Sequence, residues 1–126
     1  MCKILIIDDD PDICETFTDL LTHAGHMVRS VESGADAFRV APKMTPDIVL
    51  LDMHMPGVSG VLTLSFLRRL SRLAHTKVII VSGHADIALS AKSIWSADIF
   101  LPKPVTPGQL LDAVNSLLDT PIANGQ

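Results

Sequence analysis

Five short aliphatic segments, each bounded by polar or turn-forming residues, are spaced along the chain. They are Lys3–Ile7, Met27–Val31, Ile48–Leu51, Lys77–Val81 and Ile99–Leu101. Runs of this length that are rich in isoleucine, valine and leucine are typical of strands buried inside a sheet. The pattern therefore predicts five strands.

The segments between these strands have a helical period instead. In the first of them the apolar positions are Ile13, Phe17, Leu20, Leu21 and Ala24, which share one face of a helix. Similar stripes occur at Leu64, Leu67, Leu70 and Leu73 and from Leu110 to Leu118, with weaker ones at Ala35–Val40 and Ile87–Trp95. Five helices therefore alternate with the strands, and no hairpin turn joins two strands. This order predicts one α/β domain with a doubly wound parallel sheet built from right-handed crossovers.

Two helix starts carry a clear capping signal. Asp10 precedes Pro11, and Thr106 precedes Pro107, so each pair offers an N-cap followed by proline at the first helical position. At the other end of the chain, residues 119–126 show no apolar period. We expect the domain to span residues 1–118 and residues 119–126 to form a flexible tail or the start of a linker.

Composition excludes several functional classes. The 126 residues include ten Lys and Arg against fourteen Asp and Glu, and the net charge of −4 disfavours direct binding of nucleic acid. No apolar run is long enough for a membrane span or a signal peptide, so no membrane association is expected. Cys2 and Cys14 have neither metal-binding nor redox spacing, which favours a reducing cytoplasm.

The candidate functional side chains lie at the carboxyl ends of the predicted strands, which meet at one edge of a parallel sheet. The residues at these ends are Asp8, Asp9 and Asp10 after the first strand, Asp52 at the third, Ser82 at the fourth and Lys103 after the fifth. Clustered carboxylates repel one another, and a divalent cation relieves that repulsion. Oxygen donors without His or Cys spacing suit Mg²⁺, and Mg²⁺ with Lys103 would neutralise a dianionic phosphoryl group.

The phosphoryl donor is not expected to be a nucleotide bound by this chain. Gly57 and Gly60 match neither the Walker loop nor the dinucleotide fingerprint. A carboxylate at a strand end can instead accept a phosphoryl group covalently, as an acyl phosphate.

Four motifs occur in order at consistent spacing. They are Lys3–Asp10 (KILIIDDD), Val49–Gly60 (VLLDMHMPGVSG), Val81–Asp86 (VSGHAD) and Phe100–Pro104 (FLPKP). Together they resemble the receiver (CheY-like) domain of bacterial two-component response regulators. The resemblance implies a flavodoxin-like (βα)5 fold with strand order 2-1-3-4-5, in which Pro102 falls on an edge strand.

The resemblance also implies a role for each site residue. Asp52 would be the phosphoacceptor, and Asp8, Asp9, Asp52 and the backbone carbonyl of His54 would bind Mg²⁺. Lys103 would contact a phosphoryl oxygen. Ser82 would supply the switch hydroxyl that binds the phosphoryl group, Phe100 would be the aromatic switch residue, and the Lys103–Pro104 peptide bond would be cis.

By the same resemblance, a sensor histidine kinase or phosphotransfer protein would donate the phosphoryl group. The fourth helix, fifth strand and fifth helix would present the output surface to a downstream protein or output domain, with homodimerisation possible on activation. Such a domain assists its own phosphorylation and dephosphorylation but is not an enzyme in the usual sense.

Two alternatives remain open on sequence alone. A small phosphatase of the haloacid-dehalogenase type would use Asp8 as nucleophile and Asp10 as acid/base, although Asp52 would then have no role and no acidic pair follows Lys103. A binding module that keeps the fold without phosphorylation is the other alternative, against which the complete acidic set argues.

Overall fold

The computed structural model describes residues 2–53, 57, 59–83 and 97–124, and for residues 119–124 it describes the backbone alone. The elements are β1 (Lys3–Ile7), α1 (Pro11–His23), β2 (Met27–Val31), α2 (Gly34–Met44), β3 (Ile48–Asp52), α3 (Gly60–Arg69), η1 (Ser71–Leu73), β4 (Lys77–Ser82), β5 (Ile99–Pro102) and α5 (Pro107–Asn124). The expected helix at Ile87–Trp95 lies outside the described residues. The five predicted strands are confirmed.

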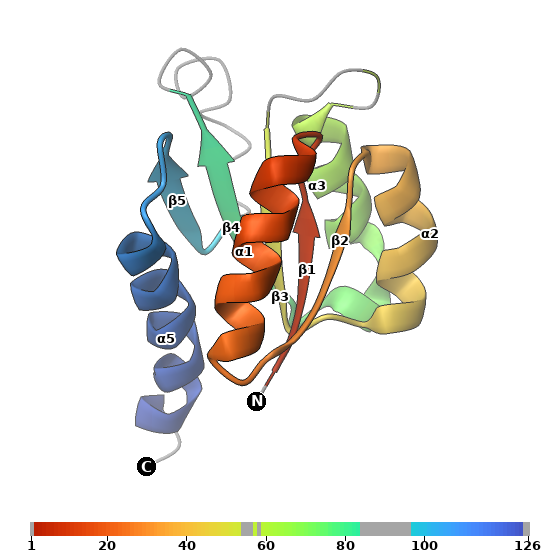
Figure 1. Ribbon diagram of the computed structural model, residues 1–126. Helices are drawn as coiled ribbons and strands as arrows, with labels where there is room; N and C mark the ends of the chain where they lie inside the picture. Colours follow the sequence, from red (N-terminus) through yellow and green to blue (C-terminus); the bar gives the residue numbers. More distant parts are fainter. Residues whose placement is uncertain (1, 54–56, 58, 84–96, 125–126) are drawn as a thin grey trace.

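The strands form one parallel sheet in the order β2-β1-β3-β4-β5, as expected (Figure 1). Helices α1 and α5 cover one face, and α2 and α3 cover the other. Alternate residues of each inner strand supply the two cores: Ile4 and Ile6 pack towards α1 and α5, whereas Leu5 and Ile7 pack towards α2 and α3. A strand covered on both faces is apolar throughout, which explains the unbroken aliphatic runs.

Both predicted caps are present. The carboxylate of Asp10 accepts hydrogen bonds from the backbone N–H of Asp12 (2.9 Å) and of Ile13 (3.4 Å) at the start of α1. At the start of α5, Thr106 Oγ1 accepts from the backbone N–H of Gln109 (3.1 Å), and Gln109 Oε1 accepts from that of Thr106 (2.9 Å). The second pair is a reciprocal capping box. These caps fix where each helix begins relative to the sheet edge.

The leucine stripe from Leu64 to Leu73 is not one helix, contrary to the prediction. The α-helix α3 ends at Arg69, Leu70 is extended (φ −85°, ψ 121°), and the 3₁₀ turn η1 follows. At about 100° per residue, a continuous α-helix would place Leu73 about 180° away from Leu64. Because the chain breaks at Leu70, both leucines are buried in the same core.

The last helix is longer than predicted. Helix α5 runs to Asn124, so the backbone after Leu118 is helical and Pro121 lies inside the helix. Proline removes one backbone donor but leaves those of the residues that follow, so a helix can continue a short way past it. The expectation that regular structure ends at Leu118 was therefore wrong, while the assignment of 119–126 to a linker stays a prediction.

Pro102 lies on the edge strand β5, as expected, where a missing backbone donor is tolerated. No helix within the described residues has the length and apolar character needed to cross a bilayer.

Candidate functional site

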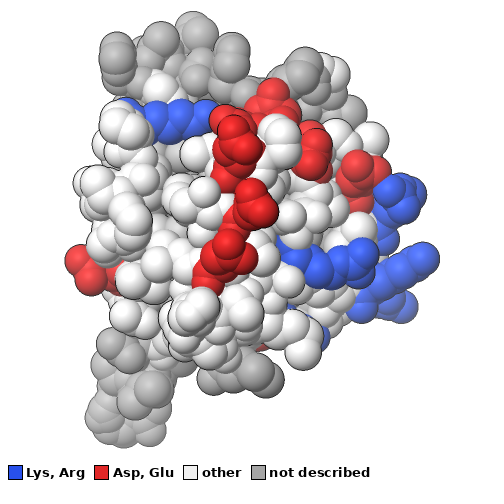
Figure 2. Space-filling view, in the orientation of Figure 1, with Lys and Arg blue, Asp and Glu red and all other residues white. Residues whose placement is uncertain are grey.

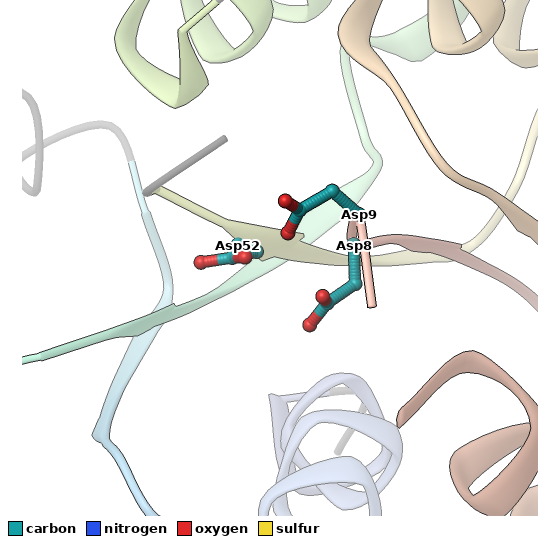
Figure 3. A group of neighbouring side chains, drawn as sticks. All are labelled: Asp8, Asp9 and Asp52. Carbon is teal, nitrogen blue, oxygen red and sulfur yellow. The ribbon is translucent and has the colours of Figure 1, made fainter. Parts of the chain in front are cut away.

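Four of the polar residues predicted to meet, Asp8, Asp9, Asp52 and Lys103, do meet at the carboxyl end of the sheet. Asp8 follows β1, Asp52 is the last residue of β3, and Lys103 follows β5. Figure 3 shows Asp8 and Asp9, which follow β1, close to Asp52 at the end of the neighbouring strand β3. One oxygen of each carboxylate lies within 4.8 Å of the others.

The three carboxylates differ in exposure and in support. Asp8 and Asp52 are buried, with 6% and 2% of their surface exposed, whereas Asp9 is exposed. Asp8 Oδ1 accepts a hydrogen bond from the backbone N–H of Asp10 at 2.9 Å, which orients its carboxylate. Two acids are therefore held in place by the fold, and the third closes the cluster from the solvent side.

The environment raises the pKa of Asp8 from 3.8 to about 6. Burial is the main cause, because it disfavours the charged carboxylate, and the negative charge of Asp52 adds to it. The hydrogen bond from Asp10 and the charge of Lys103 act in the opposite direction. Without a cation, the cluster therefore holds more negative charge than the fold readily accommodates.

Lys103 supplies part of the missing positive charge. Its Nζ lies 3.1 Å from Asp52 Oδ1, and its side chain is 41% exposed. Burial alone would lower the pKa of Lys103, but its hydrogen bond to Asp52 and the charges of Asp8 and Asp9 raise it overall. The Lys103–Pro104 peptide bond is cis. The ammonium group thus stays charged beside the Asp52 carboxylate.

The donor set fits a hard divalent cation. Three carboxylates in reach of one point, with no sulfur or imidazole donor among them, match the oxygen ligands that Mg²⁺ prefers. Within the part of the chain that the structure describes, this is the one group of three or more His, Cys, Asp or Glu residues close enough to share a metal ion. The carbonyl of His54, expected as a further ligand, lies outside the described residues.

A cavity of about 780 Å³ opens beside the carboxylates. Its polar end is formed by Asp8, Asp9, Asp10 and Lys103, and its apolar walls include Ile13, Phe17, Val81 and Val105. Their helical spacing places Ile13 and Phe17 on the face of α1 that covers the sheet, but such a stripe does not indicate which turn of the helix reaches the sheet edge. The cavity gives an incoming group an apolar wall next to the charges.

The two expected switch residues lie near the cluster without joining it. Ser82 ends β4, is 1% exposed, and its hydroxyl donates to the backbone carbonyl of Gly83 at 3.0 Å. The β3–β4 register sets Asp52 beside Val81, so Ser82 is on the strand next to the Asp52 carboxylate. Phe100 is half-buried on β5 and packs against the core under α2 and α3.

Comparison with known proteins identifies the family of this chain. Residues 4–115 match the model of the response regulator receiver domain. Protein PilH of Pseudomonas aeruginosa is 34% identical over 122 residues, which cover 94% of this chain and 98% of PilH. The phosphoglycerate transport system transcriptional regulatory protein PgtA of Salmonella typhimurium is 32% identical, but the chain spans only 28% of its length.

A solved structure agrees with these sequence matches. The response regulator protein TrrA of Thermotoga maritima, in complex with Mg²⁺-BeF, superposes with a TM-score of 0.82 at 29% identity and covers 93% of this chain and 99% of its own. The family match does not support the alternative phosphatase, which would leave Asp52 without a role. The chain therefore belongs to the response regulator receiver domains, the phosphorylation-dependent switches of two-component signalling.

Proposed function

We propose that Asp52 accepts a phosphoryl group, with Asp8 and Asp9 completing a Mg²⁺ site and Lys103 binding a phosphoryl oxygen. The observation that carries this proposal is the position of the Asp52 carboxylate. It is buried, it lies in the three-carboxylate cluster, and Lys103 Nζ approaches one of its oxygens at 3.1 Å. A nucleophile, a cation site and a fixed ammonium group thus meet at one point.

The chemistry follows from these charges. A carboxylate oxygen of Asp52 would form the new bond to phosphorus while the bond from phosphorus to an imidazole nitrogen of the donor's phosphohistidine breaks. This would leave an acyl phosphate on Asp52 and the free imidazole on the donor. Lys103 balances part of the charge that the transferred group brings, about −2. Asp8, Asp9 and Asp52 would hold the Mg²⁺ ion, which would supply the remaining positive charge when bound.

The response to phosphorylation would begin at Ser82. Its hydroxyl now bonds to the Gly83 carbonyl, a local contact that it can exchange for a phosphoryl oxygen. Phe100, half-buried on the neighbouring edge strand, would reorient as the backbone after Ser82 moves. The output surface would comprise the fourth helix, which lies outside the described residues, together with β5 and α5.

The partners belong to the same proposal. A sensor histidine kinase or phosphotransfer protein would be the donor, and a downstream protein or an attached output domain would be the target. PgtA, named as a transcriptional regulatory protein, is one relative that is much longer than this chain. The buried, unpaired cysteines Cys2 and Cys14 suit the proposed location in the cytoplasm.

The test is Mg²⁺-dependent labelling with acetyl phosphate, followed by peptide mapping. We expect the wild type to carry one label on the peptide that contains Asp52, and Asp52→Asn to carry none. Asp19→Asn is the matched control, because it removes the same charge from an exposed position on α1. It should label like the wild type.

Two results would contradict the proposal. Label that persists in Asp52→Asn and maps to Asp8 would restore the phosphatase hypothesis. Absence of label, combined with no Mg²⁺-dependent binding of beryllofluoride, would favour a domain that keeps the fold as a binding module only.

A further inference from the structure

A basic groove lies between the outer strand β2 and helix α2. Arg29 aligns with Leu5 in the β1–β2 register, so both point to the face of the sheet that α2 and α3 cover. Arg29 nevertheless stays exposed beside α2. The cavity that results, about 470 Å³, is lined by Arg29, Phe38, Arg39, Val40, Pro42 and Lys43.

The groove is positively charged and has an apolar wall. Its three cations, Arg29, Arg39 and Lys43, are all exposed. Arg39 forms an ion pair with Asp36, which is also solvent-exposed and therefore contributes little. In residues 2–53, 57, 59–83 and 97–118, neither Arg29 nor Lys43 forms an ion pair. The ring of Phe38 is held against that of Phe66, with centroids 4.3 Å apart.

Helix α1 carries the opposite charge. Asp12, Glu15 and Asp19 are exposed, and their spacing of three and four residues places them along one side of the helix as an acidic stripe. Cys14, Phe17 and Leu21 form the buried side. The stripe extends over about 10 Å, since each residue adds about 1.5 Å. Figure 2 shows acidic side chains in a column over α1 and basic side chains gathered towards α2.

The two helices that carry these surfaces lie beside the same sheet edge. Strand β2 is the outer strand, with α1 on one face of the sheet and α2 on the other (Figure 1). A half-turn about an axis parallel to β2 exchanges the two faces. In a pair of copies related by that axis, α1 of each copy therefore meets α2 of the other, and the contact occurs twice.

We propose that a second copy of this chain occupies the basic groove through its acidic stripe, in a two-fold symmetric dimer with the β2 edges facing each other. Met27, the first residue of β2 and 53% exposed, adds apolar surface at one end of this contact. The dimer needs no phosphoryl group and does not use β5 or α5. Its attraction is mainly between exposed charges, so it weakens as salt screens them.

The experiment is sedimentation equilibrium with two charge-reversal variants. The first, Glu15→Lys with Asp19→Lys, makes the stripe basic, and the second, Arg39→Glu with Lys43→Glu, makes the groove acidic. Each variant alone is monomeric, because like charges then face each other at both contacts. An equimolar mixture of the two dimerises, and so does the chain that carries all four substitutions.

The wild type supplies a test that needs no variant. Its dissociation constant rises at least about tenfold when NaCl increases from about 0.02 M to about 0.5 M, as the screening length shortens to a few ångströms. The control is Arg69→Glu with Asp112→Lys, which reverses exposed charges on α3 and α5 and leaves dimerisation unchanged.

Three outcomes overturn the proposal. The first is that the wild type stays monomeric at low salt, and the second is that both reversal variants still dimerise. The third is that the mixture of the two variants stays monomeric although each variant retains the wild-type circular dichroism. Binding of an acidic peptide to the groove without self-association also rejects a second copy as the occupant. None of these results bears on labelling of Asp52, so the dimer and the proposed function fail separately.

Discussion

Replacing Asp8 with asparagine should stabilise the metal-free protein at neutral pH and have little effect in acid. Burial raises the pKa of Asp8 from 3.8 to about 6 in the folded domain. Because the folded domain binds this proton more tightly than the unfolded chain does, the free energy of unfolding is larger in acid than at neutral pH. This stability is fully present below about pH 3.8 and is lost as pH rises through about 6. The destabilising effect of Asp8 therefore develops between pH 3.8 and about 6 and is complete above it.

The structure bounds the size of this effect. At about 1.4 kcal/mol per pKa unit, the difference between 3.8 and about 6 corresponds to about 3 kcal/mol. Asp8 lines a cavity that opens to solvent, where water and salt partly screen its charge, so about 1–2 kcal/mol is the expected gain. Asparagine keeps the Oδ1 that accepts the Asp10 backbone N–H, so the substitution changes charge with little change in shape.

The assay is urea unfolding of the wild type and Asp8→Asn in a chelator, below pH 4 and at pH 7.5. At the higher pH the midpoint of the variant should lie about 1 M urea above that of the wild type, and in acid the two should nearly coincide. Added Mg²⁺ should raise the wild-type midpoint more than that of the variant. Asp19→Asn, an exposed α1 substitution, should change stability by less than about 0.5 kcal/mol.

A stability difference between the two proteins that is independent of pH would refute the reasoning. It would mean that the Asp8 carboxylate is as well solvated in the folded protein as in the unfolded chain. A variant less stable than the wild type at pH 7.5 would lead to the same conclusion.

Three further predictions concern packing, hydrogen bonding and the reactivity of a buried thiol. Gly60→Ala should cost about 1–3 kcal/mol in thermal unfolding, because a Cβ there would lie 2.4 Å from Met53 Cα, whereas Gly108→Ala, with nothing within 4 Å, should be neutral or stabilising by up to about 1 kcal/mol. Asp98→Ala should cost about 1–3 kcal/mol, because it removes the acceptor, at 2.8 Å, of a buried backbone N–H on β4; no loss would show that water replaces the carboxylate. Burial raises the pKa of the Cys14 thiol to about 11, so iodoacetamide at pH 8 should modify it only after unfolding, as followed by intact mass.

Most strands and helices could be predicted because the spacing of apolar residues in each segment fits only one type of secondary structure. The first two strands begin and end where the predicted runs do. Strand β1 is apolar and buried from Ile4 to Ile7, whereas β2, at the edge of the sheet, keeps apolar residues only at Met27, Val28 and Val31. The prediction failed where one spacing fits two structures. A leucine every third residue from Leu64 suits an α-helix over two turns and a 3₁₀ turn thereafter, and only packing shows where the change occurs.

The site was predictable to the level of which residues meet. Strand ends in a parallel sheet share an edge, so Asp8, Asp52 and Lys103 could be brought together from the order of elements alone. The sequence could not give their unequal burial or the orientation of Asp8 by the Asp10 backbone, because both depend on how tightly the first turn of α1 closes on the sheet. The apolar cavity wall could not be predicted either, because helical spacing does not indicate which turn of α1 reaches the sheet edge.

Asp52 terminates the middle strand of the five, and that position has a mechanical consequence. Strand β3 is hydrogen-bonded along both sides, to β1 and to β4, and all five of its residues are buried. Displacing β3 would break its hydrogen bonds to both β1 and β4. A phosphoryl group added to Asp52 would therefore not move the strand itself. Under the proposed phosphorylation, movement would therefore be confined to the backbone past the strand tips, and the sheet would keep its position.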